Sequence, residues 1–567
     1  MPVDPIIVEV IRGALEYIAE EMGIILRNSA YSANIKERMD HSCAIFDEIG
    51  RMIAQAEHIP VHLGAMPLAV KEAIREIETL YPGDMVILND PFHGGTHLPD
   101  ITLIAPIFYD NKIVGFVANR AHHSDVGGRV PGSMPGDSSE IFEEGIILPP
   151  VKLLEKGELN RDVLKILLAN TRTPLIRKGD IFAQIAANNR GVRRILEVIK
   201  KYSVDVFKTS IDEILNYSER RMRAEIRKMP KISARAADYL DDSGVEDRPL
   251  KIQVEITVHN DKILVDFSGT DRQVLGPVNA PLPVTLSCVY YVIRAITDPT
   301  IPANEGAYRP ISVRAPEGSI VNARPPVAVA GGNVETSQRI VDALLKAFAQ
   351  IVPDKVPAAC QGTMNNISIG GIDPRTHQQF TFYETIGGGY GARPNSDGLD
   401  GIHCHMTNTM NTPIEEIEKR YPILILKYEL RKDSGGAGKW RGGLGIERIY
   451  KVLTKAKLSV LGERHKFGPW GLRGGLPGAP GEYWVIRGNG EKIRLRSKDC
   501  IDLEPGDIVV IRTPGGGGFG NPEERDKSLV IRDLLDGKIS IKSAIDIYKL
   551  EEEPIRKLRN KIPDRNV

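Results

Sequence analysis

Apolar positions near the start of the chain recur at three- and four-residue steps, the spacing of an amphipathic helix. In residues 5–26 they are Ile6, Val10, Ile11, Leu15, Ile18 and Met22. The pattern predicts a helix that packs one face against the body of the protein. A second helix is expected over residues 65–80, and residues 158–225 are expected to be largely helical, with Ala, Leu and Ile at helical spacing among many Arg and Lys.

Two polar, Gly-flanked clusters follow predicted strands in the first part of the chain. A short buried strand in YPGDMVILND leads into NDPFHGGTHLPD. The strands ITLIAPIFYD and KIVGFVANRAHH are separated by a turn at Asn111, and the second leads into HHSDVGGRVPGSMPG. Loops at the edge of a rigid sheet often carry functional side chains, so these two clusters are the first candidates for a site.

The pattern changes to one typical of β-strands after about residue 251. KIQVEITVHNDKILVDFSG alternates apolar and polar residues around a His-Asn-Asp turn, which predicts a β-hairpin. A helix is expected in ETSQRIVDALLKAFAQIV, a β-rich portion over residues 427–511, and a charged helical tail from residue 521. We therefore expect an α+β (mixed α/β) multidomain fold. Its four regions are an N-terminal α/β region (1–230), a mixed α/β region (231–425), a β-rich region (426–520) and a helical C-terminal tail (521–567).

Length, charge and cysteine content restrict the class of protein. A chain of 567 residues is long enough for two to four packed units. Lys plus Arg equals Asp plus Glu at 74 each, so no net basic field favours binding to nucleic acid or to a membrane surface. The five cysteines are dispersed and lack C-x-x-C spacing, which indicates a reducing compartment. With neither a signal-like N-terminus nor a membrane-length apolar run, we expect a cytoplasmic protein.

The two polar clusters are rich in histidine and aspartate, namely His93, His97, His122, His123, Asp90, Asp100 and Asp125. Imidazole nitrogen and carboxylate oxygen are ligands of Zn, Mn and Fe(II), and three protein ligands leave positions open for water or substrate. His97 and Asp100 need a turn to reach one ion, and His122 can join them if the two strands are adjacent. The same groups could instead only hydrogen-bond loop backbone, and spacing alone does not choose between these interpretations.

Other candidates lie nearer the N-terminus. Asp40, in KERMDHSCAIFD, precedes a predicted strand and could be a further ligand or a general base, or it could cap a turn. His41 is its rival for either chemical role. His58 and His62, in EHIPVHLGAMP, are weaker candidates, since this loop could equally be the start of a helix with a buried imidazole.

The chain has no sound nucleotide-binding motif. The segment from Asp433 to Trp440 lacks the first Gly of a P-loop. Gly515, Gly517 and Gly520 satisfy G-x-G-x-x-G, but no βαβ unit follows, so these glycines are expected to form a tight loop against another element. No G-x-S-x-G elbow is present, which leaves covalent serine catalysis without support.

Taken together, long motifs in order along nearly the whole chain resemble hydantoinase B, of the hydantoinase/5-oxoprolinase family, which is related to the α subunit of acetone carboxylase. The motifs are SANIKERMDHSCAIFD, IPVHLGAMP, NDPFHGGTHLPD, HHSDVGG with PGSMPG, EEGIILPPVKL, GDIFAQIAANNRG, DFSGTDRQVLGPVNAP, GGNVETSQRIVDALLKA and PGGGGFG. The resemblance implies that His97, Asp100 and His122 hold a divalent metal ion, either Zn, Mn or Fe. It also implies a catalytic role for Asp40, although His41 replaces the aromatic residue expected beside it.

The resemblance further implies a hetero-oligomer with a hydantoinase A-type subunit that binds ATP. That partner would phosphorylate the carbonyl of a small cyclic amide, and this chain would hydrolyse the activated ring of hydantoin, N-methylhydantoin or 5-oxoproline. Two alternatives are an acetone carboxylase-like subunit for ATP-dependent ketone carboxylation and a noncatalytic scaffold of the complex. The resemblance assigns no role to His41, His93, His123 or Asp125.

Overall fold

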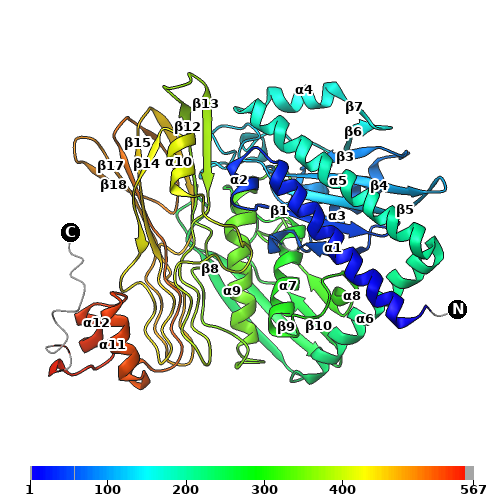
Figure 1. The fold of residues 1–567 in the computed structure, drawn as a ribbon. Helices are drawn as coiled ribbons and strands as arrows, with labels where there is room; N and C mark the ends of the chain where they lie inside the picture. The colour runs from blue at the N-terminus through cyan, green and yellow to red at the C-terminus, as the bar shows by residue number, and fades with distance from the viewer. Residues whose placement is uncertain (1–2, 57, 554, 556–567) are drawn as a thin grey trace.

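Four β-sheets and several layers of helices form the protein, whose computed structural model describes residues 3–56, 58–553 and 555 (Figure 1). The expected α+β, multidomain architecture is confirmed. The α-helices are α1 (Pro5–Ser29), α2 (Ala33–Lys36), α3 (Met66–Glu76), α4 (Arg161–Ala169), α5 (Pro174–Tyr202), α6 (Val204–Lys228), α7 (Leu282–Ile296), α8 (Glu305–Tyr308), α9 (Ser337–Phe348), α10 (Ile414–Arg420), α11 (Lys527–Leu535) and α12 (Ile541–Asp546). Short helical turns are η1 (Pro60–His62), η2 (Pro91–His93), η3 (Ile141–Glu143), η4 (Gly332–Thr336) and η5 (Pro522–Glu524).

The N-terminal region is built around a seven-stranded antiparallel sheet of order β2-β1-β5-β4-β3-β6-β7. Its strands are β1 (His41–Phe46), β2 (Met52–Ala56), β3 (Met85–Leu88), β4 (Asp100–Tyr109), β5 (Lys112–His122), β6 (Val151–Glu155) and β7 (Glu158–Leu159). Helices α1 and α5 contact one face of this sheet and α3 contacts the other. Because both faces are covered, β1, β2 and β3 are buried along their whole length.

The long helix α1 is fixed at both ends. Asp4 caps its N-terminus by accepting a hydrogen bond from the Ile6 amide at 2.8 Å, and Pro5 occupies the first turn, where its missing N–H costs nothing. Beyond its C-terminus, the Asp180 carboxylate of α5 accepts hydrogen bonds from the backbone amides of Tyr31 and Ser32 at 2.8 and 2.9 Å. The chain after α1 is therefore held against α5, directly before the residues that reach the site.

A second sheet, of order β11-β10-β9-β8, lies under α7 and α9 in the middle of the molecule. Its strands are β8 (Ser233–Leu240), β9 (Leu250–His259), β10 (Lys262–Asp266) and β11 (Ile311–Arg314). The expected hairpin is present, and Asn260 in its turn has a φ of 51°. The helix expected over 335–352 begins two residues later, at Ser337, because the turn η4 precedes it with π-helical hydrogen bonding.

Two antiparallel sheets packed face to face form the β-rich part of the chain (Figure 1, left). One has the order β13-β12-β16-β19 and the other β14-β15-β20-β17-β18. Their strands are β12 (Asn366–Ile372), β13 (Gln379–Glu384), β14 (Ile423–Leu430), β15 (Ile446–Val452), β16 (Ala456–Leu461), β17 (Glu482–Ile486), β18 (Lys492–Leu495), β19 (Lys498–Leu503) and β20 (Ile508–Arg512). The pairing of β12 with β16 joins the two sides of residue 425, and the division into four regions stays a prediction.

The glycines after β20 pack directly against neighbouring backbone, as the sequence predicted. A Cβ atom on Gly515 would lie 1.8 Å from the carbonyl oxygen of Ser434, so only glycine fits there. The tail that follows forms α11 and α12, whose apolar side chains pack around Ala437 in a small separate core. Residues 556–567 of the predicted helical tail lie outside the described residues.

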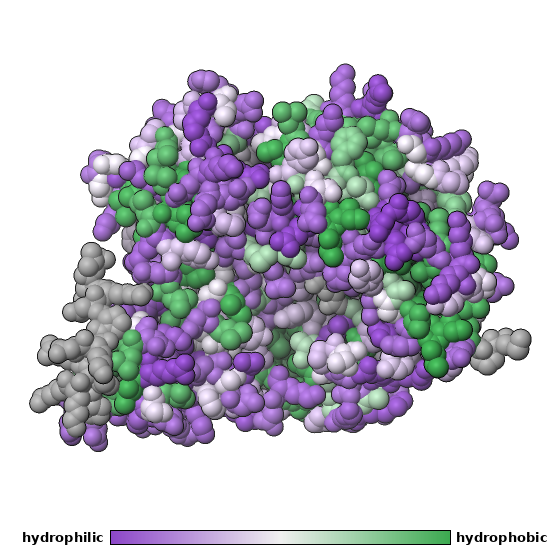
Figure 2. All heavy atoms as spheres, in the orientation of Figure 1, coloured by the Kyte–Doolittle hydropathy of each residue, from purple (hydrophilic) through white to green (hydrophobic). Residues whose placement is uncertain are grey.

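The surface is largely hydrophilic on the face drawn in Figure 2, with apolar residues in separate patches. Exposed apolar side chains on α1 are Ile6, Val10 and Tyr17. Among the residues that the structure describes, every helix is too short or too polar to cross a lipid bilayer.

Close contact between η1 and α7 leads to a test of how the fold positions the site. The Gly64 amide donates a hydrogen bond to the Ser287 hydroxyl at 2.8 Å, and a Cβ on Gly64 would lie 2.7 Å from the Ser287 backbone nitrogen. We expect Gly64→Ala to lower the free energy of unfolding by about 1–3 kcal/mol, because backbone must move to admit the methyl group. Urea denaturation followed by circular dichroism measures this change.

The matched control is Gly13→Ala in α1, where nothing lies within 4 Å of the added Cβ. Alanine in a helix interior should raise the free energy of unfolding by roughly 0.5–1 kcal/mol. Equal effects of the two substitutions would contradict the proposed steric constraint at Gly64.

Candidate metal centre

Antiparallel pairing of β4 and β5 places Asp100 directly opposite His122, so both side chains point to the same face of the sheet. Asp100 begins β4, and a turn in which its amide donates to the His97 carbonyl at 3.0 Å brings His97 to the same place. The Asp100 Oδ1 atom lies 3.1 Å from His97 Nε2 and 3.4 Å from His122 Nδ1. One ligand atom from each residue lies within 4.8 Å of the other two.

The three side chains are almost fully buried, with at most 3% of each residue exposed. Two further groups support the carboxylate of Asp100. Its Oδ2 atom lies 3.4 Å from His62 Nε2 and accepts a hydrogen bond from the Thr96 hydroxyl. His62 Nδ1 lies in turn 2.9 Å from the Ser42 hydroxyl oxygen. Of the two weaker histidine candidates, His62 thus belongs to the site.

The electrostatics keep this site ready for a cation near neutral pH. Burial alone would raise the pKa of Asp100, but the charge of His97 and hydrogen bonds from His122, His62 and His97 outweigh it and hold the pKa well below its ordinary value. Burial lowers the pKa of His122, although its hydrogen bond to Asp100 acts in the opposite direction. A carboxylate and a neutral imidazole, the protonation states that ligate metals, are therefore favoured.

The residues present fit a divalent metal ion. Both ring nitrogens of His97 and Nε2 of His122 are buried without an aligned hydrogen-bond partner among the described residues, since the 3.1 Å contact of His97 Nε2 lacks hydrogen-bond alignment. A buried unpaired polar atom costs about 1–3 kcal/mol, which a coordinate bond would offset. Two imidazoles and one carboxylate form a set that Zn, Mn and Fe(II) accept. Metal binding itself stays a proposal.

Asp40 lies beside this cluster. Its backbone carbonyl accepts a hydrogen bond from the His122 amide at 3.0 Å, and its Oδ2 atom accepts one from Asn34 Nδ2 at 3.3 Å. The same Asn34 nitrogen donates to the His122 carbonyl at 2.8 Å. Asp40 is not one of the three residues whose ligand atoms converge, and its catalytic role stays a prediction.

His41 and His123 point to the opposite face of the sheet. His41 pairs with Ala121, one position away from His122, and its ring lies 4.8 Å from the ring of His58. His123 Nε2 lies 3.0 Å from the side-chain oxygen of Gln184 on α5. Burial lowers the pKa of His41 to about 3 and that of His123 to about 4. His41 is therefore a neutral group on the helix-covered side, apart from the three converging residues.

Two other groups from the polar clusters hold loop structure. His93 Nδ1 lies 2.8 Å from Asp90 Oδ2 in the turn η2. The Asp125 carboxylate accepts hydrogen bonds from the amides of Gly127 and Gly132 and from the Arg172 guanidinium. For these groups the alternative interpretation of the sequence, hydrogen bonding within loops, describes what the structure shows.

Residues far along the chain complete the site, and the sequence reasoning missed them. The Tyr383 ring of β13 stacks on His122 at a centroid distance of 4.5 Å and an interplanar angle of 11°. Its hydroxyl donates to the Asn366 side-chain oxygen at 2.9 Å, and the Asn366 amide donates to Glu335 Oε1 at 2.8 Å. Burial raises the pKa of Glu335 to about 8. This chain of contacts brings a group that titrates near neutral pH towards His122.

Arg38 joins the N-terminal region to the β-rich part of the chain at the same point. It donates hydrogen bonds to the side chains of Asn34 and Thr385 and to the Met410 carbonyl. Its guanidinium also lies 5.1 Å from the Tyr383 ring centroid. The ring that stacks on His122 is thus held by a cation from the opposite side of the interface.

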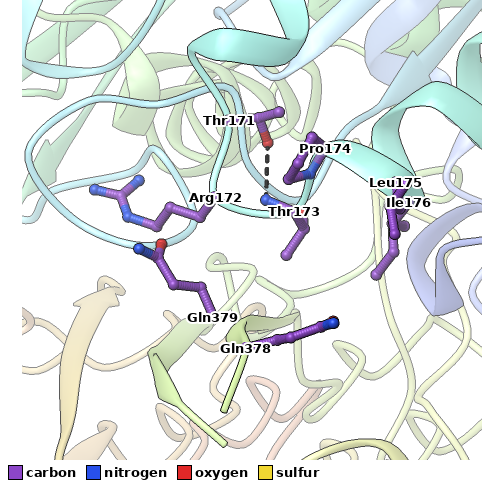
Figure 3. A pocket seen from close by; sticks show the side chains of 8 residues that line it. All are labelled: Thr171, Arg172, Thr173, Pro174, Leu175, Ile176, Gln378 and Gln379. Atoms are coloured by element: carbon purple, nitrogen blue, oxygen red, sulfur yellow. Dashed lines mark hydrogen bonds between the residues drawn. The ribbon is translucent and has the colours of Figure 1, made fainter. Parts of the chain in front are cut away.

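A groove opens between the two regions close to this interface. One pocket of about 450 Å³ is lined by residues 171–176 and by Gln378 and Gln379, which face each other across the space in Figure 3. A neighbouring pocket of about 260 Å³ shares part of this lining and reaches Ser32 and Ser124. Neither pocket includes a residue of the metal cluster, so the cluster lies deeper in the protein.

Comparison with known proteins gives a consistent family. The sequence model described as Hydantoinase B/oxoprolinase matches residues 4–522. An uncharacterized protein of Methanocaldococcus jannaschii is 50% identical over 97% of this chain and 96% of its own length. A B-type subunit of a D-/L-hydantoinase, from Pseudomonas sp. strain NS671, is 36% identical over 96% of this chain and 95% of its own length. The 5-oxoprolinase 1 of Arabidopsis thaliana is 39% identical over 89% of this chain, which spans only 41% of that longer enzyme.

Two solved structures share the fold. An ATP-dependent caprolactamase from Pseudomonas jessenii superposes with a TM-score of 0.91 at 30% identity, over 99% of this chain and 100% of that chain. A nucleotide-free acetone carboxylase superposes with the same TM-score, 0.91, over 96% of this chain and 79% of that chain. Its identity is 21%, so this likeness concerns the fold alone.

The geometry predicts which histidines bind a metal. We expect His97→Ala to weaken Mn²⁺ binding by about 10-fold or more, because even outer partners of ligands contribute that much. His93→Ala is the matched control, since His93 contacts Asp90 and is not one of the converging residues. Titration of the full chain with Mn²⁺, with free ion followed by electron paramagnetic resonance, compares the two. Equal Mn²⁺ binding by both variants would show that the cluster does not hold this ion.

Proposed function

The chain belongs to the hydantoinase B/oxoprolinase family, and from this premise we propose that it is the metal-dependent subunit of an ATP-dependent cyclic amidohydrolase. Its substrate would be the carbonyl-phosphorylated form of a small cyclic amide such as a hydantoin, N-methylhydantoin or 5-oxoproline. A separate hydantoinase A-type subunit would bind ATP and make this intermediate. The observation that carries the proposal is the buried convergence of His97, Asp100 and His122 within 4.8 Å.

Division of the reaction between two subunits has a chemical reason. Nitrogen donates electrons to an amide carbonyl, so its carbon is a poor electrophile. Transfer of the γ-phosphoryl group of ATP to the carbonyl oxygen makes that carbon electrophilic and releases ADP. Water then adds to the carbon, the ring C–N bond breaks, and the phosphate group leaves. The chain has no P-loop sequence, which agrees with ATP binding on another subunit.

The residues of this chain would act on the second half of that sequence. His97, Asp100 and His122 would hold the ion, which when bound supplies Lewis-acid polarisation and can lower the pKa of water from about 15.7 to about 7. Asp40, beside His122, would accept the proton of the attacking water. Glu335, whose pKa is raised to about 8, would be protonated near neutrality and could return a proton through Asn366 and Tyr383 to the leaving nitrogen.

The groove between the N-terminal region and the start of β13 would give the substrate access. Its lining reaches Ser32 and Ser124, the second of which follows His122 by two positions. Tyr383 covers the His122 ring from the β13 side. Passage of a small ring would thus require separation at the interface that Arg38 bridges, which would keep bulk water from the activated intermediate.

Two alternatives remain as outcomes of the test. A ketone-carboxylating subunit is the first, and the higher identity to the caprolactamase, 30% against 21%, favours the hydrolase. A noncatalytic scaffold is the second, and the paired metal-type residues argue against it. The cytoplasmic location and the hetero-oligomer stay predictions.

A coupled assay tests the proposed reaction. The purified chain and its hydantoinase A-type partner would receive ATP with 5-oxoproline, with N-methylhydantoin, or with acetone and bicarbonate. We expect ADP formation coupled to ring opening of a cyclic amide, abolished by His97→Ala and kept by His93→Ala. ADP formation coupled only to acetone consumption would overturn the hydrolase, and full activity of the His97→Ala complex would indicate a scaffold.

Asp40 can be tested separately from metal binding. We expect Asp40→Asn to lower kcat by about 10²–10⁴-fold, the usual contribution of a general base, while Mn²⁺ affinity and KM change little. Asp90→Asn is the control, because that carboxylate contacts His93 and the Phe92 amide in η2. Parallel loss of Mn²⁺ and activity in Asp40→Asn would instead make Asp40 a further metal ligand.

A further inference from the structure

A second group of metal-type side chains lies apart from the His97 cluster. Cys360, Cys404 and His405 are buried, and one ligand atom from each lies within 4.8 Å of the other two. Two cysteines and a histidine form a soft ligand set, unlike the two histidines and one aspartate of the first cluster. The three residues come from the segments before β12 and before α10.

The backbone is shaped so that these side chains converge. Cys404 and His405 are neighbours, and neighbours in an extended chain point to opposite sides. His405 has a φ of 56°, in the left-handed region that residues other than glycine seldom adopt. This turn allows both side chains to reach Cys360. The Gln338 side chain of α9 holds the turn by donating to the Cys404 carbonyl at 3.1 Å.

The imidazole of His405 has one supported and one free nitrogen. Its Nδ1 atom lies 3.4 Å from the Tyr291 hydroxyl of α7. Its Nε2 atom is buried and has no hydrogen-bond partner among the described residues, in a residue only 4% exposed. Metal-ligating histidines commonly show this arrangement, in which one nitrogen contacts a polar group and the other binds the ion.

A pocket of about 270 Å³ gives access to this cluster. His405, Tyr291 and Tyr390 line it, together with Asp354, Lys355 and Arg393. Asp354, Lys355 and Arg393 are exposed, so the pocket leads from the surface towards the imidazole. Such a path provides both a route for an ion and space for a fourth ligand.

From this geometry we propose that Cys360, Cys404 and His405 bind one Zn²⁺ ion, with a water molecule from the pocket as the fourth ligand. Tetrahedral Zn²⁺, with bonds of about 2.0–2.3 Å, separates its ligand atoms by about 3.3–3.8 Å, which the observed limit of 4.8 Å accommodates with little movement. Binding releases two thiol protons and converts Zn²⁺ plus two thiols into a neutral zinc dithiolate. Charge neutrality removes most of the cost of burying the ion.

The zinc ion would join two segments that lead to the first cluster. Met406, which follows His405, accepts a hydrogen bond through its carbonyl from the Val61 amide at 3.3 Å. Val61 precedes His62, which contacts Asp100. The second ion would therefore fix the segment against which the His62 turn packs. The proposal does not depend on the reaction assigned to the first cluster.

Cobalt substitution of the full chain tests the proposal. Co²⁺ bound by thiolates gives a sulfur-to-cobalt charge-transfer band that ligation by nitrogen and oxygen alone does not give. We expect this band in the wild-type protein and in His97→Ala. It should be lost in the double variant Cys360→Ser/Cys404→Ser and kept in Cys500→Ser, whose thiol contacts Gly136 and Ser459 elsewhere. Zinc content should fall by one equivalent per chain in the double variant only.

Two results would overturn the proposal. One is the absence of a thiolate–cobalt band in the folded, reduced wild-type protein, a measurement that needs no variant to fold. The other is a Cys360–Cys404 disulfide, detected as a mass lower by two hydrogens in protein purified without a reductant and unable to take up Zn²⁺ after reduction. Loss of ring opening in the coupled assay, with the cobalt band intact, would count against the proposed function alone.

Discussion

A carboxylate removed from water must be compensated, and in this protein much of the architecture serves to compensate Asp100. Its partners come from three places: the turn before β4, the end of β5, and the helical turn η1. The long strand pair fixes His122 opposite Asp100. Helix α7 supports η1 through the backbone of Ser287, and therefore the approach of His62. Without such support, the carboxylate would remain uncompensated or take up a proton.

The site is completed where two regions meet. One side provides the converging ligands, and the other provides Tyr383, Asn366 and Glu335, all from beyond residue 330. Arg38 spans this boundary with hydrogen bonds and a contact to the Tyr383 ring. Because polar contacts dominate here, the boundary can separate at a smaller cost than an apolar interface of the same extent, which suits a site that must admit a substrate and then exclude water.

Local sequence predicted much of the fold and the centre of the candidate site. The strands, the hairpin and the long helices followed from periodicity, and the resemblance selected His97, Asp100 and His122. Strand alternation also explains why His41 and His123 face α1 and α5, away from Asp100. The role of His62 depends on how η1 packs against α7, and the role of Tyr383 depends on packing across more than 250 residues of sequence. No local pattern records such contacts, so these residues could not be identified in advance.

The exact pairing of Asp100 with His122 also bears on how the protein matures. A shift of one residue between β4 and β5 would send one of these side chains to the helix-covered face, because successive residues alternate between faces. A chain paired in that way would retain most of its apolar contacts yet would have no metal cluster. An ion that binds only the correctly paired form would favour it by mass action. Metal supply during synthesis would then influence the yield of native protein as well as its activity.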